Sequence, residues 1–534
     1  MIRKCSFFLL VFAIIAVASD AWAHAQLMAS VPEAGAVLPE QPPKIILQFN
    51  EPVSPVSIKW IAPGGEVVAL PTGWTVQNDL VEVEAPAGLA RGSHLVSYRV
   101  MSADGHPIGG TLTFSIGTPS MQPSIGAALN VGNISSARLA ALGRLALTVT
   151  LVFGIGGVIY SVFVDRGTVT QGWARSTAIV LSALTFVTAP AALVLQGLDI
   201  EAMSFSGVVT NAPWRAALAA PFATTAAFAV LASALGIIAL RLSGDRLRVL
   251  LGAMAWLLAA ASFAASGHAA TGKPQFLTQP ALMAHAAGII FWLGGLLPLL
   301  GLAMTTSSRL AESLTRFSKI AVPLVALTVF TGIGLAIVQV EDIHLLWSTS
   351  YGCILMAKMI LVACLIGYGA ANRFILTPAI VCQQSEAAKT LVKSIGAELV
   401  LVVMILALAA GFRLTPPPRA IAAADRIGVS SHLHHDATMA QITLHPGRAG
   451  PNELKLMVMD GRHHPIEAKE VSVIVQDAAK GIEPIRATAR EDEDGTWRAD
   501  AIVIPLSGAW IVRVDILISD FEMRRMEGEI QVRP

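Results

Sequence analysis

Thiol, thioether and imidazole side chains recur in one apolar part of the chain. Cys353, Met356 and Cys364 fall on one face of a helix at about 100° per residue. His268 and His285 end and begin neighbouring apolar segments. These are the ligand types that Cu(I) prefers, so the pattern favours a Cu(I) path through the membrane. Two structural alternatives stay open, because Cys and Met also fill apolar cores and an imidazole beside a Trp can anchor a helix at an interface.

The N-terminus has the pattern of an export signal. Arg3 and Lys4 precede an apolar run over 6–18, and Ala21-Trp22-Ala23 fits the small-x-small cleavage rule. Cleavage there would make His24 the new N-terminus, where one residue offers both an α-amine and an imidazole. An uncleaved anchor is the alternative.

A second pair of ligand types lies near residue 105. Asp104 and His106 are two residues apart, so at the end of an extended strand both project to one side. Imidazole, amine and carboxylate in a square arrangement suit Cu(II), and the alternative is an Asp-Gly turn with a solvated His. His94 alternates with Val96 and Tyr98 and is predicted to be a strand residue rather than a ligand.

Composition excludes several classes of protein. Of 534 residues, 54% are hydrophobic and only 14% are charged, against about 25% charged in soluble domains. A wholly soluble enzyme is therefore excluded. A net charge of +1 without a basic block argues against a nucleic-acid partner. No Gly-rich loop followed by Lys-Ser/Thr occurs, so direct use of ATP is not expected.

Eight apolar segments are long enough to span a bilayer, at about 20 residues each. They are 139–162, 177–197, 216–240, 249–266, 281–303, 320–340, 352–374 and 396–413. The odd-numbered connections between them carry most of the basic residues, which predicts that these connections are cytoplasmic and both flanking regions exported. Lys358 and Glu398 lie near opposite faces, and snorkelling to the interface would explain either one.

The predicted fold is therefore multidomain, with an N-terminal all-β Greek-key or Ig-like sandwich, an eight-helix transmembrane bundle and a C-terminal all-β sandwich. The predicted boundaries are a signal peptide at 1–23, a β-sandwich at 24–118, a linker at 119–137, the membrane domain at 138–414, a linker at 415–431 and a second sandwich at 432–534. The last domain is rich in histidine, which leaves a second copper site and surface histidines as equal alternatives. Its candidate ligands are His432, His434, His435, His463 and His464.

The N-terminal domain resembles the CopC family of periplasmic copper-binding proteins. The resemblance lies in His24-Ala25, in the turn Asn50-Glu51-Pro52-Val53, and in the run Tyr98–Pro107 followed by Gly109-Gly110. It implies that His24, Asp104 and His106 bind Cu(II). The Met-rich loop of some family members is missing between 48 and 71, so no Cu(I) site is expected in this domain.

The membrane domain resembles CopD, the integral partner of CopC, most strongly over 266–413. The ordered polar landmarks that carry the resemblance are Ser266-Gly267-His268, His285 with 291–296, Arg316-Phe317-Ser318, Thr331-Gly332, Tyr351-Gly352, Lys358, Asn372-Arg373 and Glu398. The C-terminal domain loosely resembles YtkA-like domains.

These features predict a protein of the bacterial inner membrane, with both β domains in the periplasm, that binds copper and transports it, inward, without being an enzyme. The expected partners are copper ions, the lipid bilayer and periplasmic copper proteins. Two rivals remain: a membrane-tethered copper chaperone or store, and a histidine-brace copper monooxygenase. The monooxygenase is disfavoured because Asp104 beside His106 would occupy the position that must stay open for oxygen.

Overall fold

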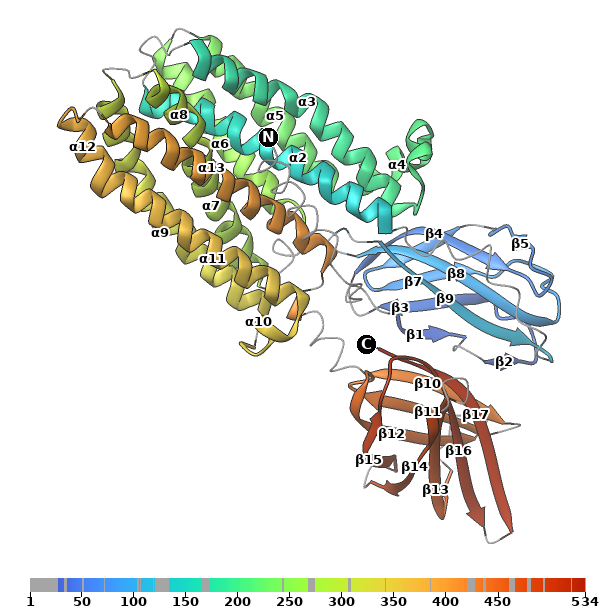
Figure 1. Ribbon diagram of the computed structural model, residues 1–534. Coiled ribbons are helices and arrows are strands. Elements are labelled where there is room, and N and C mark those ends of the chain that lie inside the picture. Colours follow the sequence, from blue (N-terminus) through green and yellow to red (C-terminus); the bar gives the residue numbers. More distant parts are fainter. Residues whose placement is uncertain are drawn as a thin grey trace. The chain divides into compact units, whose positions relative to one another are not determined.

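The computed structural model describes most of the chain (Figure 1). The described residues are 27–32, 36–49, 52–71, 73–102, 105, 107–118, 120, 134–165, 172–242, 244–267, 274–305, 309–340, 342–384, 386–415, 417–419, 428–435, 438–460, 466–477, 482–492, 495–519 and 521–533. Two all-β regions flank a helical region, which confirms the predicted multidomain fold class.

The N-terminal region consists of two sheets around one apolar core. Its strands are β1 (Leu27–Val31), β2 (Val37–Leu38), β3 (Lys44–Phe49), β4 (Val53–Ile61), β5 (Val67–Val68), β6 (Trp74–Gln77), β7 (Leu80–Glu84), β8 (Gly92–Ser102) and β9 (Pro107–Ile116). One sheet has the order β1-β3-β7-β6 and the other β2-β9-β8-β4-β5. Alternate residues of β3, such as Ile45 and Leu47, are fully buried. Period-2 alternation of this kind is what places one face of a strand in a sandwich core.

The helical region contains eight helical segments that are long and apolar enough to cross a membrane, counted over the described residues. They are Ser136–Val164, Gly172–Ile200, Phe222–Arg241, Asp245–Ala264, Gln275–Met304, Leu310–Val340, Ser350–Val381 and Ala387–Leu414. The corresponding helices are α2 (Ile134–Ile159), α3 (Gly172–Ile200), α5 (Phe222–Arg241), α6 (Asp245–Ala264), α7 (Gln275–Gly294) with α8 (Leu296–Met304), α9 (Leu310–Val340), α11 (Ser350–Ala371) with α12 (Thr377–Val381), and α13 (Ala387–Gly411). Short helices α4 (Asn211–Ala219) and α10 (Leu345–Ser348) lie in connections.

These spans match the eight predicted ones, but several begin earlier or end later. The sixth begins at Leu310 instead of 320, and the eighth at Ala387 instead of 396. The added turns contain charged residues such as Arg316 and Lys389. Such residues lower hydropathy without interrupting a helix, because Arg, Lys and Glu have good helix propensity.

Helix α2 is the central element of the bundle. It packs against α3, α5, α6, α7 and α13. Of its most apolar stretch of 18 residues, 83% is buried. A Cβ on Gly156 of α2 would collide with the backbone of Gly294 in α7. The close approach of α2 and α7 therefore requires glycine at both positions.

The C-terminal region is an eight-stranded sheet in the order β10-β11-β12-β15-β14-β13-β16-β17. The strands are β10 (Val429–His435), β11 (Thr438–His445), β12 (Gly450–Asp460), β13 (Glu470–Asp477), β14 (Ile482–Glu491), β15 (Trp497–Ile504), β16 (Gly508–Ser519) and β17 (Glu522–Val532). The first and last strands contact each other, and the Ser431 hydroxyl donates to the Glu529 carbonyl at 2.7 Å. The region is all-β as predicted, and its sheet curves into a barrel-like form in which inward residues of all strands share one core.

Candidate metal sites

His285 is held by a neighbouring helix in the membrane region. It lies on α7, half-buried, with its Nδ1 2.8 Å from the carbonyl oxygen of Thr328 on α9 and 3.4 Å from Thr331 Oγ1. A carbonyl oxygen only accepts, so Nδ1 carries the proton. The neutral imidazole then has its lone pair on Nε2, which makes no hydrogen bond to any described residue. A carbonyl bonded to one ring nitrogen is the usual support of a metal-binding histidine.

The sequence of α9 makes room for this imidazole. A Cβ on Gly332 would lie 2.9 Å from His285 Cε1, and a Cβ on Gly288 of α7 would collide with the Thr328 hydroxyl. Glycine on each helix therefore lets α7 and α9 approach closely enough for the ring to reach the carbonyl. His285 is ten residues into a helix that begins at Gln275, or about 15 Å along its axis. Trp292, the residue that would anchor the helix at the interface together with His285, is buried.

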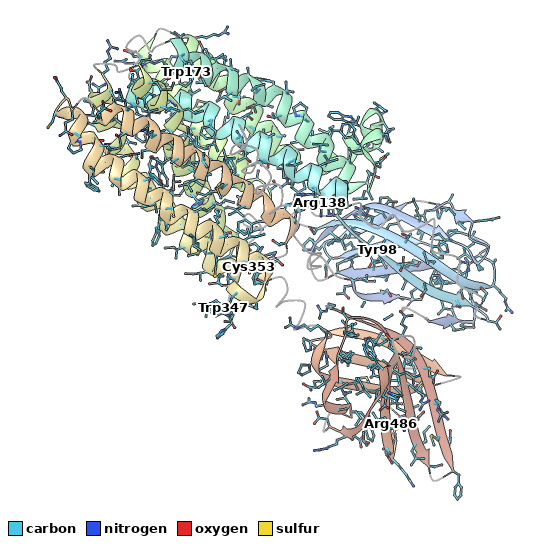
Figure 2. All side chains as sticks on the ribbon, viewed as in Figure 1. Tyr98, Arg138, Trp173, Trp347, Cys353 and Arg486 are labelled. Carbon is cyan, nitrogen blue, oxygen red and sulfur yellow. The ribbon has the colours of Figure 1, made fainter. Side chains whose placement is uncertain are left out.

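The sulfur residues of α11 occupy a different environment. Cys353 and Cys364 are exposed, and Met356 is half-exposed. Their span is the least buried of the eight described, since only 6% of its most apolar stretch of 18 residues is buried. Figure 2 shows Cys353 at the end of α11 near Trp347, whose carbonyl is 3.9 Å from the thiol sulfur. The stripe therefore lies on the outward face of the bundle, and its role in a Cu(I) path stays a prediction.

Two other polar residues of the membrane region are packed rather than snorkelling. Lys358 Nζ lies 5.5 Å from the centre of the Phe412 ring and interacts electrostatically with His285. Glu398 is 1% exposed and accepts a hydrogen bond from the amide of Asn372, whose own oxygen accepts from Ser394 at 2.6 Å. Snorkelling was therefore the wrong explanation for Glu398. A hydropathy pattern does not show which residue of another helix Glu398 contacts, so the sequence did not predict Asn372 as its partner.

A buried ion pair joins three helix ends, and the sequence did not predict it. Arg413, just after α13, pairs with Asp199 at the end of α3, and Ser136 of α2 donates to the same carboxylate at 3.2 Å. Both charged side chains are less than a tenth exposed. Charged residues at the ends of apolar segments are the only sequence signal, and they are equally typical of solvated loops.

The N-terminal residues His24, Asp104 and His106 lie outside the described residues, but the strands around them are described. Leu27 pairs with Phe49 at one end of the domain. Val53, four residues later, pairs with Ser102, and Met101 pairs with Pro107. The start of β1, the end of β8 and the start of β9 therefore lie at the same end of the sandwich.

His94 is buried inside the N-terminal domain. Its Nε2 donates to the carbonyl of Ala90 at 2.8 Å, and its Nδ1 accepts from Trp60 Nε1 at 3.2 Å. Burial lowers the pKa of the imidazole, and the hydrogen bond to Ala90 partly opposes this effect. Both ring nitrogens are used within the protein, so His94 is a strand residue as the sequence indicated.

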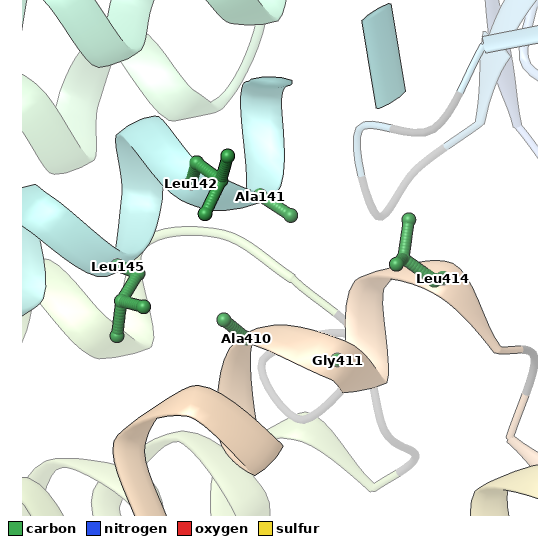
Figure 3. A pocket seen from close by; sticks show the side chains of 6 residues that line it. All are labelled: Ala141, Leu142, Leu145, Ala410, Gly411 and Leu414. Atoms are coloured by element: carbon green, nitrogen blue, oxygen red, sulfur yellow. The ribbon is translucent and has the colours of Figure 1, made fainter. Parts of the chain in front are cut away.

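The remaining predicted ligands are not brought together as a described metal site. His268, His463 and His464 lie outside the described residues, while His432, His434 and His435 belong to β10. Within the described part of the chain, no three His, Cys, Asp or Glu side chains form a group that could hold a metal ion. A recess between α2 and α13 is lined by aliphatic residues only and offers no side-chain donor (Figure 3). Its residues are Ala141, Leu142, Leu145, Ala410, Gly411 and Leu414.

The fold defines a multi-pass membrane protein, with eight helical segments among the described residues that are long and apolar enough to cross a membrane and an all-β region on either side of them in the sequence. Comparison with known families matches residues 27–117 to the CopC domain and residues 311–412 to CopD, copper resistance protein D. The chain thus combines a CopC domain with a CopD domain, as predicted. The CopD match begins at α9 and includes Thr328 and Gly332, but it does not extend to His285.

One curated protein and two solved structures are similar to this chain. The chain is 24% identical over 552 residues to the copper transport protein CutJ of Bacillus subtilis (strain 168), and 98% of each chain is covered. Solved structures of CopC from Methylosinus trichosporium OB3b and of PcoC, a methionine-rich copper resistance protein from Escherichia coli, are each 28% identical. They cover 18% of this chain and 98% and 99% of their own, with TM-scores of 0.17 and 0.16. The YtkA-like resemblance of the C-terminal region stays a prediction.

Proposed function

We propose that the protein captures copper in the periplasm and transports it inward across the bacterial inner membrane. Similarity to a copper transport protein over nearly the whole chain supports transport. The distribution of basic residues among the connections supports a topology with both β domains in the periplasm. In this proposal His24, Asp104 and His106 bind Cu(II), and a shared site is supported by the strand ends next to them in the sequence, which lie at one end of the sandwich.

The observation that carries the membrane step is the hydrogen bond from His285 Nδ1 to the Thr328 carbonyl. It leaves Nε2 as the free ligand atom on a half-buried ring inside a membrane-spanning helix. Polar groups in such segments are costly and are retained for function. His285 therefore acts as the outer-side copper ligand, and His268, at the end of the preceding span, is its predicted partner.

No enzymatic activity is expected of the protein, because each assigned residue binds or passes on a metal ion and none acts on an organic substrate. Periplasmic copper proteins are the expected donors or acceptors of the ion. Cys353, Met356 and Cys364 stay candidates for Cu(I). Their outward position would place that ion at the surface of the bundle rather than on its axis.

Total cellular copper tests the proposal at fixed external copper, with and without the protein. His285→Ala is expected to reduce the copper gained through the protein by about tenfold or more, since a metal ligand is lost. His344→Ala is the matched control, because His344 is exposed in a connection between α9 and α11. A fall in cellular copper on expression would reverse the direction of transport.

A copper store or chaperone is the second candidate function. The exposed positions of Cys353 and Cys364 favour it, since a transport path through the bundle would need inward ligands. Unchanged copper flux in a His285→Ala, Cys353→Ser double variant would support storage and contradict transport.

A further inference from the structure

Glu398 is a carboxyl group inside the helical region that the proposed copper path does not use. It lies on α13, 11 residues after the helix begins at Ala387, or about 16 Å along the helix axis. The residue is 1% exposed. An ionisable group is costly to place inside a membrane bundle, and in pumps and transporters such carboxyl groups act as proton relays. The position of Glu398 therefore indicates a role in transport.

The amide of Asn372 holds the carboxyl group of Glu398. Its Nδ2 donates to Glu398 Oε1, and its Oδ1 accepts a hydrogen bond from the Ser394 hydroxyl at 2.6 Å. Ser394 and Glu398 are four residues apart on α13, so the amide lies across one turn of that helix. An amide N–H can donate to a carboxylate and also to the carbonyl oxygen of a protonated carboxyl group. This contact can therefore hold the side chain in either charge state.

Among the described residues, no cation forms an ion pair with Glu398. Helix α13 packs against α2, α8, α11, α12, the π-helical turn Asn372–Leu376 and the turn Phe412–Leu414, and neither α8 nor α12 contains a charged residue. Four cations of the other elements have partners elsewhere: Lys358 lies over the Phe412 ring, Arg373 donates to Ser318, Arg144 donates to Gln196 and Arg413 pairs with Asp199. Arg138 lies near the start of α2, and Lys389 and Lys393 lie in the first two turns of α13.

The remaining titratable groups of these elements belong to α11 and also lie elsewhere. Tyr351 packs against Phe412, with the ring centroids 4.5 Å apart. Tyr368, Cys353 and Cys364 are exposed. The contact between Asn372 and Glu398 therefore contains a single titratable group among the described residues.

The backbone departs from the α-helix at Asn372. Asn372–Leu376 is a π-helical turn between α11 and α12, and the Thr377 hydroxyl donates to the Asn372 carbonyl at 2.7 Å. Single π-helical turns inside longer helices are rare and occur frequently at functional sites. The irregular turn and the buried carboxyl group coincide at one contact, which favours a functional role over ordinary helix packing.

We propose that Glu398 is the proton-binding residue that couples copper transport to proton movement. The carboxylate takes up one proton from the periplasmic side, and the resulting carboxyl group releases that proton to the cytoplasm. One proton thus enters the cell with copper in each transport cycle, no electron moves in this step, and the carboxylate is restored at its end. The inference rests on the proposed inward transport of copper, to which it adds a driving force.

The full-length protein in sealed lipid vesicles, with a pH-sensitive dye trapped inside, tests the coupling. Cu(I) is added outside with excess reductant, and the membrane potential is clamped with K⁺ and valinomycin. With the unmodified protein, copper uptake should acidify the lumen, and a lower external pH should accelerate uptake severalfold.

Glu398→Gln should lose both the acidification and the response to external pH. Glutamine keeps a side-chain oxygen that can accept from Asn372 but cannot take up a proton, so a purely structural role of Glu398 would leave both measurements unchanged. Glu386→Gln is the matched control, because Glu386 is exposed at the start of the same helix, and it should behave like the unmodified protein. The thermal unfolding of Glu398→Gln must match that of Glu386→Gln, so that lost coupling does not report a lost fold.

Two outcomes would overturn the inference and leave the transport proposal intact. Undiminished acidification by Glu398→Gln would show that its contact with Asn372 only joins two helices. Copper uptake by the unmodified protein without acidification of the lumen would show that no proton accompanies copper, and this result does not depend on any variant. The absence of copper uptake by the unmodified protein would instead reject the transport proposal, and the inference with it.

Discussion

His94 and His285 each donate a hydrogen bond from one ring nitrogen to a backbone carbonyl, but they differ at the other ring nitrogen. His94 donates from Nε2 to the Ala90 carbonyl, and His285 donates from Nδ1 to the Thr328 carbonyl. The second nitrogen of His94 accepts a hydrogen bond from Trp60. The second nitrogen of His285 has no such donor among the described residues. An imidazole whose two nitrogens both form hydrogen bonds within the protein stabilises the fold. An imidazole that is oriented by a hydrogen bond at one nitrogen can bind a metal through the other.

The largest expected effect comes from removing the structural histidine. His94→Leu should lower the free energy of unfolding of the N-terminal domain by about 1–3 kcal/mol, because it leaves the buried Trp60 N–H without a partner. Hydrogen exchange of the β8 and β9 amides in the full chain measures this change. A loss well below 1 kcal/mol would mean that the two hydrogen bonds do not stabilise the domain as described.

Crowding the ring of His285 should impair copper transport without removing the ligand. Gly332→Ala adds a Cβ 2.9 Å from His285 Cε1, so the imidazole must shift away from the Thr328 carbonyl. Loss of such orienting contacts costs about tenfold or more in metal affinity. Gly334→Ala, two residues along α9 and with nothing within 4 Å of its added Cβ, should have no effect on copper accumulation. Equal accumulation in the two variants would show that the Thr328 contact is not needed.

The smallest effect is a pH dependence specific to His94. Burial lowers the pKa of this imidazole in the folded domain below its value of 6.5 in the unfolded chain. The unfolded state therefore binds the proton more strongly, and the stability contributed by neutral His94 is present above pH 6.5 and is lost as the pH falls below it. Hydrogen exchange of β8, corrected for intrinsic rates, should show a steeper loss of stability between pH 7.5 and 5 in the unmodified protein than in His94→Leu. Parallel pH profiles would contradict the lowered pKa.

Most of the architecture could be predicted from the sequence because it depends on local patterns. Eight apolar runs predict eight spans without any knowledge of their packing. The motif Ser102–Pro107 and the polar landmarks of the membrane region predict both domain matches. The limits of the spans are predicted less well, because Arg316 and Lys389 lie in first turns of helices that hydropathy begins too late.

The sequence by itself determined which ligand types are available and in which region each lies, because composition and periodicity are properties of the chain alone. Only the tertiary structure decided how they are used. The contact of His285 with Thr328 requires a glycine on each of two helices, Gly288 facing Thr328 and Gly332 facing the ring of His285. The packing of α7 against α9 decides this contact, because residues far apart in the chain come together only in the folded bundle.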